Sequence, residues 1–359
     1  MAIRLWLLGI PLLLCLAETA TAEPYIAIEK GLQCSACHTH AAGAGMRTTY
    51  GNIYAQTEMA SFLAGEDADY WNGEIAQWLR VGANLRGRFE YIDDDDGEDR
   101  TSFDIVRGDI YVQASFLDDK VSVYFDQQVA PSSSINREAY VLLKGSKFRF
   151  TAGQFYLPYG WRLQDDTAFV RRTTGITMAN PDRGVQLGYE TGRWSHAVSV
   201  TNGSGGGSET DDGKQLSLMT SFNTGRWRLG VSANHNDSEL GDRSMANLFG
   251  GIRTGDIAWL FEIDAIRDEL PDGTDNNGLA GLAEANWRFR RGHNLKVSYE
   301  YFDPDDDIDE DHQTRWSALY EWTPFAFLQA RFGARSNDGP PDTGGTDTQL
   351  FFAELHGFF

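Results

Sequence analysis

The sequence has few cysteines, few basic residues for its length and no long apolar run beyond its first residues. Its 359 residues include 31 Lys and Arg against 52 Asp and Glu, a net charge of −21. This sign argues against nucleic acid as a partner, because Lys and Arg must neutralise phosphates there. No segment after residue 22 approaches the roughly 18 consecutive apolar residues that a transmembrane helix needs. Three cysteines in so long a chain also exclude a disulfide scaffold.

Residues 1–22 predict a secretory signal peptide. Arg4 supplies positive charge, residues 5–16 form an apolar core, and Ala20-Thr21-Ala22 offers a small-x-small cleavage site. The core is too short to span a bilayer. Cys15 lies within it, but Leu14 stands before that cysteine where a lipoprotein signal has a small residue, so we do not expect lipidation. The chain has 38 glycines and 13% aromatic residues. Together with the predicted export, this composition favours a β-rich protein, either soluble or a membrane barrel.

The two remaining cysteines fall in the sequence Cys34-Ser35-Ala36-Cys37-His38. This C-x-x-C-H pattern is typical of c-type haem attachment, in which both thiols bond to the haem and the histidine binds its iron. A redox cysteine pair would need a βαβ context, and a zinc knuckle would need further Cys or His ligands. The sequence shows neither context, so it predicts one covalent haem c, with His38 as the proximal iron ligand.

Two methionines are candidates for the distal iron ligand. Met46 and Met59 follow the motif at distances that a short wrapped segment would close, and methionine opposite histidine raises the haem potential. His40 is too close in sequence to His38 to reach the opposite face of the same haem. An open or weakly held distal position is the other outcome that the sequence leaves open.

We divide the mature chain into a haem segment, residues 23–75, and a barrel, residues 76–359. Residues 41–45 are only alanine and glycine, and about fifty residues is marginal for an independent domain. Either the haem serves as the core of this segment, or the segment leans on the barrel and plugs its lumen.

From about Trp78 to the C-terminus, apolar and polar residues alternate. Residues 79–91, 227–234 and 295–301 each place apolar side chains on one face and charged or polar ones on the other. Such alternation is typical of transmembrane strands with one face toward lipid and the other toward the lumen. We therefore expect an all-β fold, an antiparallel transmembrane barrel of about sixteen strands. Strands are predicted near residues 78–92, 102–116, 120–129, 137–145, 147–156, 184–191, 193–202, 213–224, 226–236, 243–254, 256–267, 278–290, 293–303, 312–323, 325–336 and 347–359.

The predicted connections alternate in length, as expected of an even-stranded outer-membrane barrel with short periplasmic turns and long external loops. Phe359 ends an amphipathic last strand in which Glu354 and His356 face the lumen, and this resembles the insertion signal of such barrels. Both barrel ends would then lie in the periplasm, with the haem segment on that side or inside the barrel. The expected location is the bacterial outer membrane, in contact with lipid and lipopolysaccharide. The tight turns are predicted at Asp118-Asp119, Gly145-Ser146, Gly192-Arg193, Gly225-Arg226, Gly255-Asp256, Gly292 and Thr323-Pro324.

The predicted external loops are acidic, at residues 93–99, 209–212 and 303–311. They would form a solvated surface that binds the divalent cations bridging lipopolysaccharide, or a surface that concentrates cations for the protein itself. Residues 303–309 approach a calcium-loop pattern but lack its glycine and terminal glutamate.

The longest predicted loop, residues 158–183, is the most basic stretch of the chain. Folded into the lumen, its arginines would line the pore and favour anions, or pair with acids of the plug; salt bridges to Asp165, Asp166 and Asp182 are the alternative. The four candidate pore-lining residues are Arg162, Arg171, Arg172 and Arg183.

Two resemblances follow from these motifs. Residues 153–160, 182–189 and 200–203 (GQFYLPYG, DRGVQLGY and VTNG) look like segments of the phosphate-selective porin family. The order of signal, single C-x-x-C-H, short segment with Arg47 and Tyr50-Gly51, and then a porin is similar to the fused cytochrome–porins of iron-oxidising bacteria. That resemblance implies a haem at or inside the barrel, with electrons passing from extracellular iron(II) to periplasmic carriers.

Three functions are consistent with the sequence. The first is electron transfer through the single haem between an extracellular metal or other redox partner and periplasmic carriers, which would make extracellular iron oxidation an enzymatic role. The second is a passive anion-selective porin with an accessory haem domain, and the third is a scaffold for a separate cytochrome. The sequence has no G-x-S-x-G, H-E-x-x-H or nucleotide loop that would indicate hydrolysis or group transfer. It leaves monomer and homotrimer open.

Overall fold

The computed structural model describes residues 23–63, 65, 69–94, 98–131, 134–340 and 347–359. The predicted signal peptide with Cys15 lies outside these residues, as do residues 95–97 of the first acidic loop.

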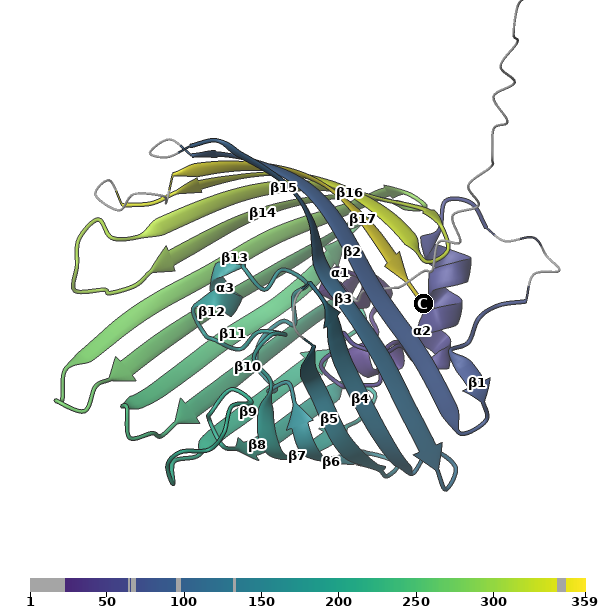
Figure 1. Ribbon diagram of the computed structural model, residues 1–359, viewed down its shortest axis with the longest axis horizontal. Helices are drawn as coiled ribbons and strands as arrows, with labels where there is room; N and C mark the ends of the chain where they lie inside the picture. The colour runs from purple at the N-terminus through teal and green to yellow at the C-terminus, as the bar shows by residue number, and fades with distance from the viewer. Residues whose placement is uncertain (1–22, 64, 66–68, 95–97, 132–133, 341–346) are drawn as a thin grey trace, which may run out of the picture.

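Sixteen antiparallel strands, β2 to β17, form a closed barrel (Figure 1). Each strand pairs with its neighbours in the chain, and β17 closes the barrel by pairing with β2, so that Phe358 lies opposite Asn84. A short additional strand, β1 (Glu74–Ala76), pairs with the start of β2. The barrel strands are β2 (Leu79–Asp94), β3 (Arg100–Phe116), β4 (Val121–Ala130), β5 (Ile135–Lys144), β6 (Phe148–Phe155), β7 (Asp182–Glu190), β8 (Trp194–Thr201), β9 (Gln215–Asn223), β10 (Trp227–Asn236), β11 (Asp242–Thr254), β12 (Ile257–Glu269), β13 (Asp275–Arg290), β14 (His293–Asp303), β15 (Gln313–Phe325), β16 (Leu328–Asp338) and β17 (Thr348–Phe358).

The predicted strands and the alternation of loop lengths are confirmed, with one turn displaced. Strand β15 continues through Pro324, and the turn lies instead at Ala326 and Phe327, where Phe327 has a positive φ of 67°. The pairing of β15 with β16 shifts register between Trp322 and Phe325. A proline lacks the N–H that a regular ladder needs but is tolerated at such a bulge, so the expected turn at Thr323-Pro324 was wrong.

The two faces of the barrel wall differ as the sequence pattern predicts. On β10, Leu229 and Val231 are exposed on the outside, whereas Arg228, Ser232 and Asn234 are buried on the inside. An apolar exterior and a polar interior are the surfaces of a transmembrane barrel. Among the described residues, no helix is long and apolar enough to cross a membrane.

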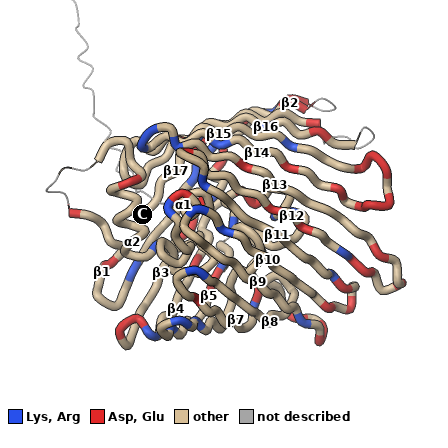
Figure 2. The backbone as a smooth tube through the Cα atoms, turned by 180° about the vertical axis from the view of Figure 1, so that it is seen from behind, with Lys and Arg blue, Asp and Glu red and all other residues tan. Residues whose placement is uncertain are grey.

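Acidic residues gather in the long connections at one end of the barrel (Figure 2). Within the connection from β14 to β15, Asp305, Asp306 and Asp307 bring their carboxylates within 4.8 Å of one another. The end with the short turns also carries the C-terminus, which lies beside the N-terminal helices (Figure 1).

The N-terminal segment forms short helices: α1 (Pro24–Lys30), η1 (Cys34–Ala36), α2 (Thr49–Tyr54) and η2 (Ala55–Met59). Proline at the start of α1 suits the first turn, where no N–H bond is lost. Gly31 ends α1 in the left-handed conformation, and its backbone N–H donates to the carbonyls of Ala27 and Ile28. The side chain of Thr48 caps α2 by accepting from the N–H of Gly51 at 3.1 Å.

This segment packs into the mouth of the barrel at the end with the short turns. Tyr25 and Ile28 of α1 are buried against Phe249 and Leu260 of the wall. Arg288 of β13 donates to Glu29 at 2.7 Å, which adds an ion pair to the apolar contact. The segment therefore rests against the barrel wall through both apolar and charged side chains.

The long loop between β6 and β7, here called L3 (residues 156–181), folds inside the barrel and carries the short helix α3 (Phe169–Arg172). The backbone N–H of Trp161 donates to Glu262 of β12 at 3.0 Å, and that of Phe169 donates to Glu300 of β14 at 2.6 Å. Trp161 and Leu163 share an apolar cluster with Tyr25. L3 and the N-terminal segment thus pack on each other within the lumen.

Candidate functional site: a cavity around the C-x-x-C-H motif

The motif folds as a single tight turn. The N–H groups of Cys37 and His38 both donate to the carbonyl of Cys34, at 3.1 and 3.0 Å. Both cysteines are half-buried and neither is in a disulfide. Two free thiols on one turn, followed at once by a histidine, are the attachment groups that haem c requires.

Local contacts hold the turn in place. His38 and Arg47 form an isolated antiparallel bridge, and Thr48 donates its N–H to the carbonyl of Cys37 at 3.0 Å. Helix α2 packs directly on this peptide, because a Cβ on Gly51 would lie 2.3 Å from the Cys37 carbonyl oxygen. Only glycine allows that approach, which gives the Tyr50-Gly51 pair of the sequence a physical role.

The barrel wall fixes the other side of the motif. Arg228 of β10 donates to the Leu32 carbonyl at 2.7 Å, to Gln33 at 2.8 Å and to the Cys34 sulfur at 3.4 Å. It is a lumen-facing strand residue, and nothing in its local sequence indicates this role.

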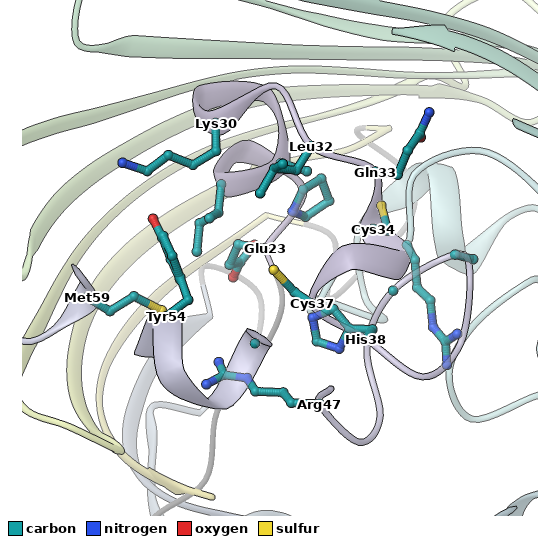
Figure 3. A pocket seen from close by; sticks show the side chains of 17 residues that line it. Glu23, Lys30, Leu32, Gln33, Cys34, Cys37, His38, Arg47, Tyr54 and Met59 are labelled. Atoms are coloured by element: carbon teal, nitrogen blue, oxygen red, sulfur yellow. The ribbon is translucent and has the colours of Figure 1, made fainter. Parts of the chain in front are cut away.

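A mainly apolar cavity, partly open to solvent, adjoins the motif. Cys34, Cys37 and His38 line one side of it, and Tyr54 and Met59 lie across from Cys37 and His38 (Figure 3). The remaining lining residues that bear on the chemistry are Glu23, Lys30, Arg47 and Arg162.

The His38 side chain is buried and neutral. It is 3% exposed, and its Nδ1 atom has no hydrogen-bond partner among the described residues. Burial, and then the positive charges of Arg47 and Arg162, lowers the pKa of His38 to about 3, so the imidazole is neutral at physiological pH. A neutral, buried imidazole at the wall of an apolar cavity could serve as an iron ligand.

The structure separates the two candidate distal methionines. Met59 lines the cavity, at the end of η2. Met46 is 2% exposed but belongs to a different cluster, with Tyr111, Tyr124 and Tyr140, and its N–H donates to the Tyr124 hydroxyl at 3.0 Å. Only Met59 of the two therefore shares the cavity with His38.

His40 does not line this cavity. It makes structural contacts next to the motif instead. Its Nδ1 accepts from the Ala42 N–H at 3.1 Å and faces Arg162 at 2.9 Å, and its Nε2 lies 3.8 Å from Glu138. Arg162 in turn stacks on Tyr156 at 3.6 Å from the ring centroid. Through this chain of contacts L3 is tied to the C-x-x-C-H motif, an arrangement that the sequence did not indicate.

The four loop arginines do not gather at one place. Arg162 lines the cavity, while Arg171 is buried and paired with Glu262. Arg172 lies over the Phe169 ring and donates to Gln313 at 3.2 Å, and Arg183 donates to Gln154 at 3.0 Å. Partners on the wall therefore engage these side chains, rather than Asp165, Asp166 and Asp182.

Asp165 of L3 pairs with the wall at Arg335. Burial alone would raise the pKa of Asp165, but the charge of Arg335 and the hydrogen bonds from Thr167 and Arg335 outweigh it and hold that pKa below its usual range.

No protein-family model matches the chain, and no curated protein matches it either. Solved structures do share its fold. A loop-L8 deletion mutant of OmpT, an outer membrane protein of Vibrio cholerae, aligns with a TM-score of 0.61 at 12% identity, over 79% of this chain and 100% of that one. The anion-selective porin from Comamonas acidovorans aligns with a TM-score of 0.61 at 11% identity, over 78% and 99%. OmpT in a trimer form aligns with a TM-score of 0.60 at 11% identity, over 79% and 100%. These likenesses establish a porin-like fold.

Proposed function

We propose that this protein resides in the bacterial outer membrane and transfers electrons between an external redox partner and periplasmic carriers through one haem c held in the barrel mouth. The observation that carries the proposal is the placement of Cys34, Cys37 and His38 on one wall of a cavity inside the barrel. A passive pore has no need of two free thiols and a neutral histidine at that place.

The chain's own residues have distinct roles in this proposal. Cys34 and Cys37 would hold the cofactor, and His38 and Met59 would bind its iron. The bound haem supplies a one-electron iron couple, and the protein supplies position, ligands and dielectric. Tyr54 lines the cavity, and Arg47 and Arg162 place positive charge at its edge.

The location of the cavity bears on the route across the membrane. The apolar band of such a barrel is about 25 Å tall, and the cavity lies at the end with the short turns, which we assign to the periplasm. The acidic loops at the other end would concentrate cations outside (Figure 2). Periplasmic carriers would dock at the barrel mouth, and the external partner would approach through the lumen.

The membrane context follows from the fold. The barrel's apolar exterior would contact lipid and, in the outer leaflet, lipopolysaccharide. Because one porin with this fold is described in a trimer form, we extend the proposal to a homotrimer.

The proposal is tested with the purified protein in sealed liposomes that hold a redox dye, with iron(II) added only outside. We expect reduction of the haem band and then of the dye, and loss of both in a Cys34→Ala/Cys37→Ala variant. An Arg183→Gln variant, altered at an exposed position at the start of β7, serves as the matched control and should behave as wild type. Dye reduction that persists without the two cysteines would contradict the proposal.

A second candidate is a passive anion-selective porin with an accessory haem segment. It is favoured by the shared fold with the anion-selective porin from Comamonas acidovorans. This function predicts an anion conductance across planar bilayers that is the same in wild type and in the cysteine variant.

A further inference from the structure

Five consecutive short turns of the barrel each carry an exposed basic residue. These residues, here called the basic rim, lie in or beside the turns from β5–β6 to β13–β14 and are Lys147, Arg193, Arg226, Arg253 and Arg290. The acidic connections lie at the other end of the barrel (Figure 2). In a chain with 31 Lys and Arg against 52 Asp and Glu, such a row of cations runs against the overall charge.

Turn geometry does not require these cations. Gly225, Gly255 and Gly292 supply the positive φ that the tight turns need. An exposed residue beside such a glycine can be any polar residue, so the fold alone does not explain why a basic one recurs in all five turns.

The acids at this part of the rim are mostly engaged with other cations. The ion pairs here are Arg149–Glu190 at 3.3 Å, Arg288–Glu29 at 2.7 Å, Lys30–Glu29 at 3.2 Å and Arg291–Glu58 at 3.8 Å. Asp256 is the remaining acid of the five turns. Within the part of the chain that the structure describes, no ion pair involves a residue of the basic rim, so its charges are available to a partner.

The basic rim faces the barrel mouth and not the lipid. Each rim residue is the chain neighbour of a large apolar residue that is exposed on the outer face; these are Phe148, Trp194, Trp227, Ile252 and Phe289. Successive side chains of a strand point to opposite faces. The strand residues Arg253 and Arg290 therefore lie on the lumenal side of the wall.

Helix α1 connects the basic rim to the cavity around the C-x-x-C-H motif. Arg253 donates to the Glu29 carbonyl at 3.1 Å, and a Cβ on Gly31 would lie 2.5 Å from the Cα of Gly225. Lys30, between Glu29 and Gly31, lines the cavity. A protein that covers the rim would therefore also cover the helix that borders the cavity.

We propose that the basic rim is the docking surface for the periplasmic carrier, and that this carrier is a soluble electron-transfer protein with an acidic face. Opposite charges steer the encounter of two proteins and set their orientation. Docking at the rim places the redox centre of the carrier next to the cavity, where one electron is exchanged and no bond forms or breaks. The inference rests on the proposed electron transfer and adds the chemistry of the partner.

The test is stopped-flow reduction of the detergent-purified holoprotein by a reduced plant-type [2Fe–2S] ferredoxin, an acidic one-electron donor of low potential. We expect Arg226→Gln/Arg253→Gln to lower the second-order rate constant about tenfold at low ionic strength. The difference should shrink above about 0.1 M salt, where the Debye length is about 10 Å. Lys214→Gln/Arg267→Gln removes two exposed cations at the acidic end and should react as wild type.

If loss of the Arg253 bond to Glu29 disturbs the N-terminal segment, Arg226→Gln/Arg290→Gln should give the same fall in rate. Equal rate constants in wild type and both rim variants, or an equal fall in the Lys214→Gln/Arg267→Gln control, would overturn the inference. The inference is also wrong if ferredoxin binding is unchanged while the rim variants lose thermal stability only in phosphatidylglycerol vesicles, because the rim then binds lipid headgroups.

Binding of oxidised ferredoxin to the Cys34→Ala/Cys37→Ala variant separates docking from electron transfer. We expect this variant to bind with wild-type affinity although it cannot be reduced, and binding to weaken when the rim substitutions are added. That result supports the docking surface even if the liposome experiment shows no electron transfer across the membrane. Loss of binding in the cysteine variant itself would contradict a surface formed by the rim.

Discussion

Replacing Glu262 by glutamine should release L3 from the barrel wall. The Glu262 carboxylate pairs with Arg171, accepts from the Trp161 N–H at 3.0 Å and accepts from Asn247 at 2.8 Å. The Arg171 and Glu262 side chains are 3% and 0% exposed, so the Glu262→Gln variant leaves a buried guanidinium without its partner.

The size of the effect follows from that burial. Breaking a buried ion pair by removing one partner costs about 3–5 kcal/mol. Asp264 still acts on Arg171 electrostatically, and glutamine can keep the bond to Trp161, so the lower end applies here. At about 1.4 kcal/mol for each factor of ten, about 3 kcal/mol raises the population of undocked L3 roughly a hundredfold.

Limited trypsin digestion measures this population, because the loop contains Arg162, Arg171 and Arg172 as cleavage sites. Cleavage follows the equilibrium fraction of the open form when opening is fast. Glu190→Gln is the control, since it breaks a lumenal pair with Arg149 (3.3 Å) outside L3. We expect rapid cleavage of Glu262→Gln alone; equal cleavage rates in the two variants would refute the assignment of Glu262 as the anchor.

Three further predictions follow from the structure. Met59→Leu should alter the visible spectrum of the haem and lower its midpoint potential because the distal sulfur is lost, whereas Met46→Leu should change neither; the reverse result would exchange their roles. Val231→Arg places a charge on the exposed outer face of β10 and should destabilise the barrel by about 2–4 kcal/mol if the site lies near the bilayer midplane, measured by urea unfolding in lipid vesicles; an unchanged midpoint would contradict a lipid-facing position. Since Asp165 has a depressed pKa beside Arg335, its stabilising contribution is present above the ordinary carboxyl pKa of about 4 and is lost as pH falls below it. The protection factors of L3 amides, which are corrected for the intrinsic exchange rate at each pH, should fall at low pH in wild type and depend less on pH in Asp165→Asn; equal pH dependence in both would contradict this role.

The barrel could be predicted from the sequence because its physical requirement is local. Each strand must present apolar groups to lipid and polar groups to the lumen. Apolar and polar residues therefore alternate with a period of two in every strand. Strand β10 shows this alternation, because Leu229 and Val231 are exposed on the outside while Arg228 and Ser232 are buried on the inside. The one displaced turn, at Thr323-Pro324, fell where proline resembles a turn residue but sits at a bulge within the strand.

The surroundings of the C-x-x-C-H motif could not be predicted in the same way. The motif itself is a local pattern, but its cavity depends on Arg228, Tyr54 and Glu23, which come from separate parts of the chain. Met46 and Met59 are equivalent by sequence distance, but Met46 packs in a different cluster, and its N–H donates to the Tyr124 hydroxyl of the wall. Contacts of this kind are set by tertiary packing and leave no periodic signal.

The charged residues of the lumen are a second case in which the sequence alone could not predict the contacts. The sequence drew attention to the arginines of L3, because they cluster within one short stretch of an acidic chain. In the structure Arg171 pairs with Glu262 of β12, while Arg172 and Arg183 donate to Gln313 and Gln154, so the wall engages these arginines one by one. Closure of the barrel also places Arg86 of β2 between Arg107 of β3 and His356 of β17, with Glu354 as its nearby acid. The clustering of like charges in the sequence therefore says little here, because the register across the closed sheet decides which partner each side chain meets.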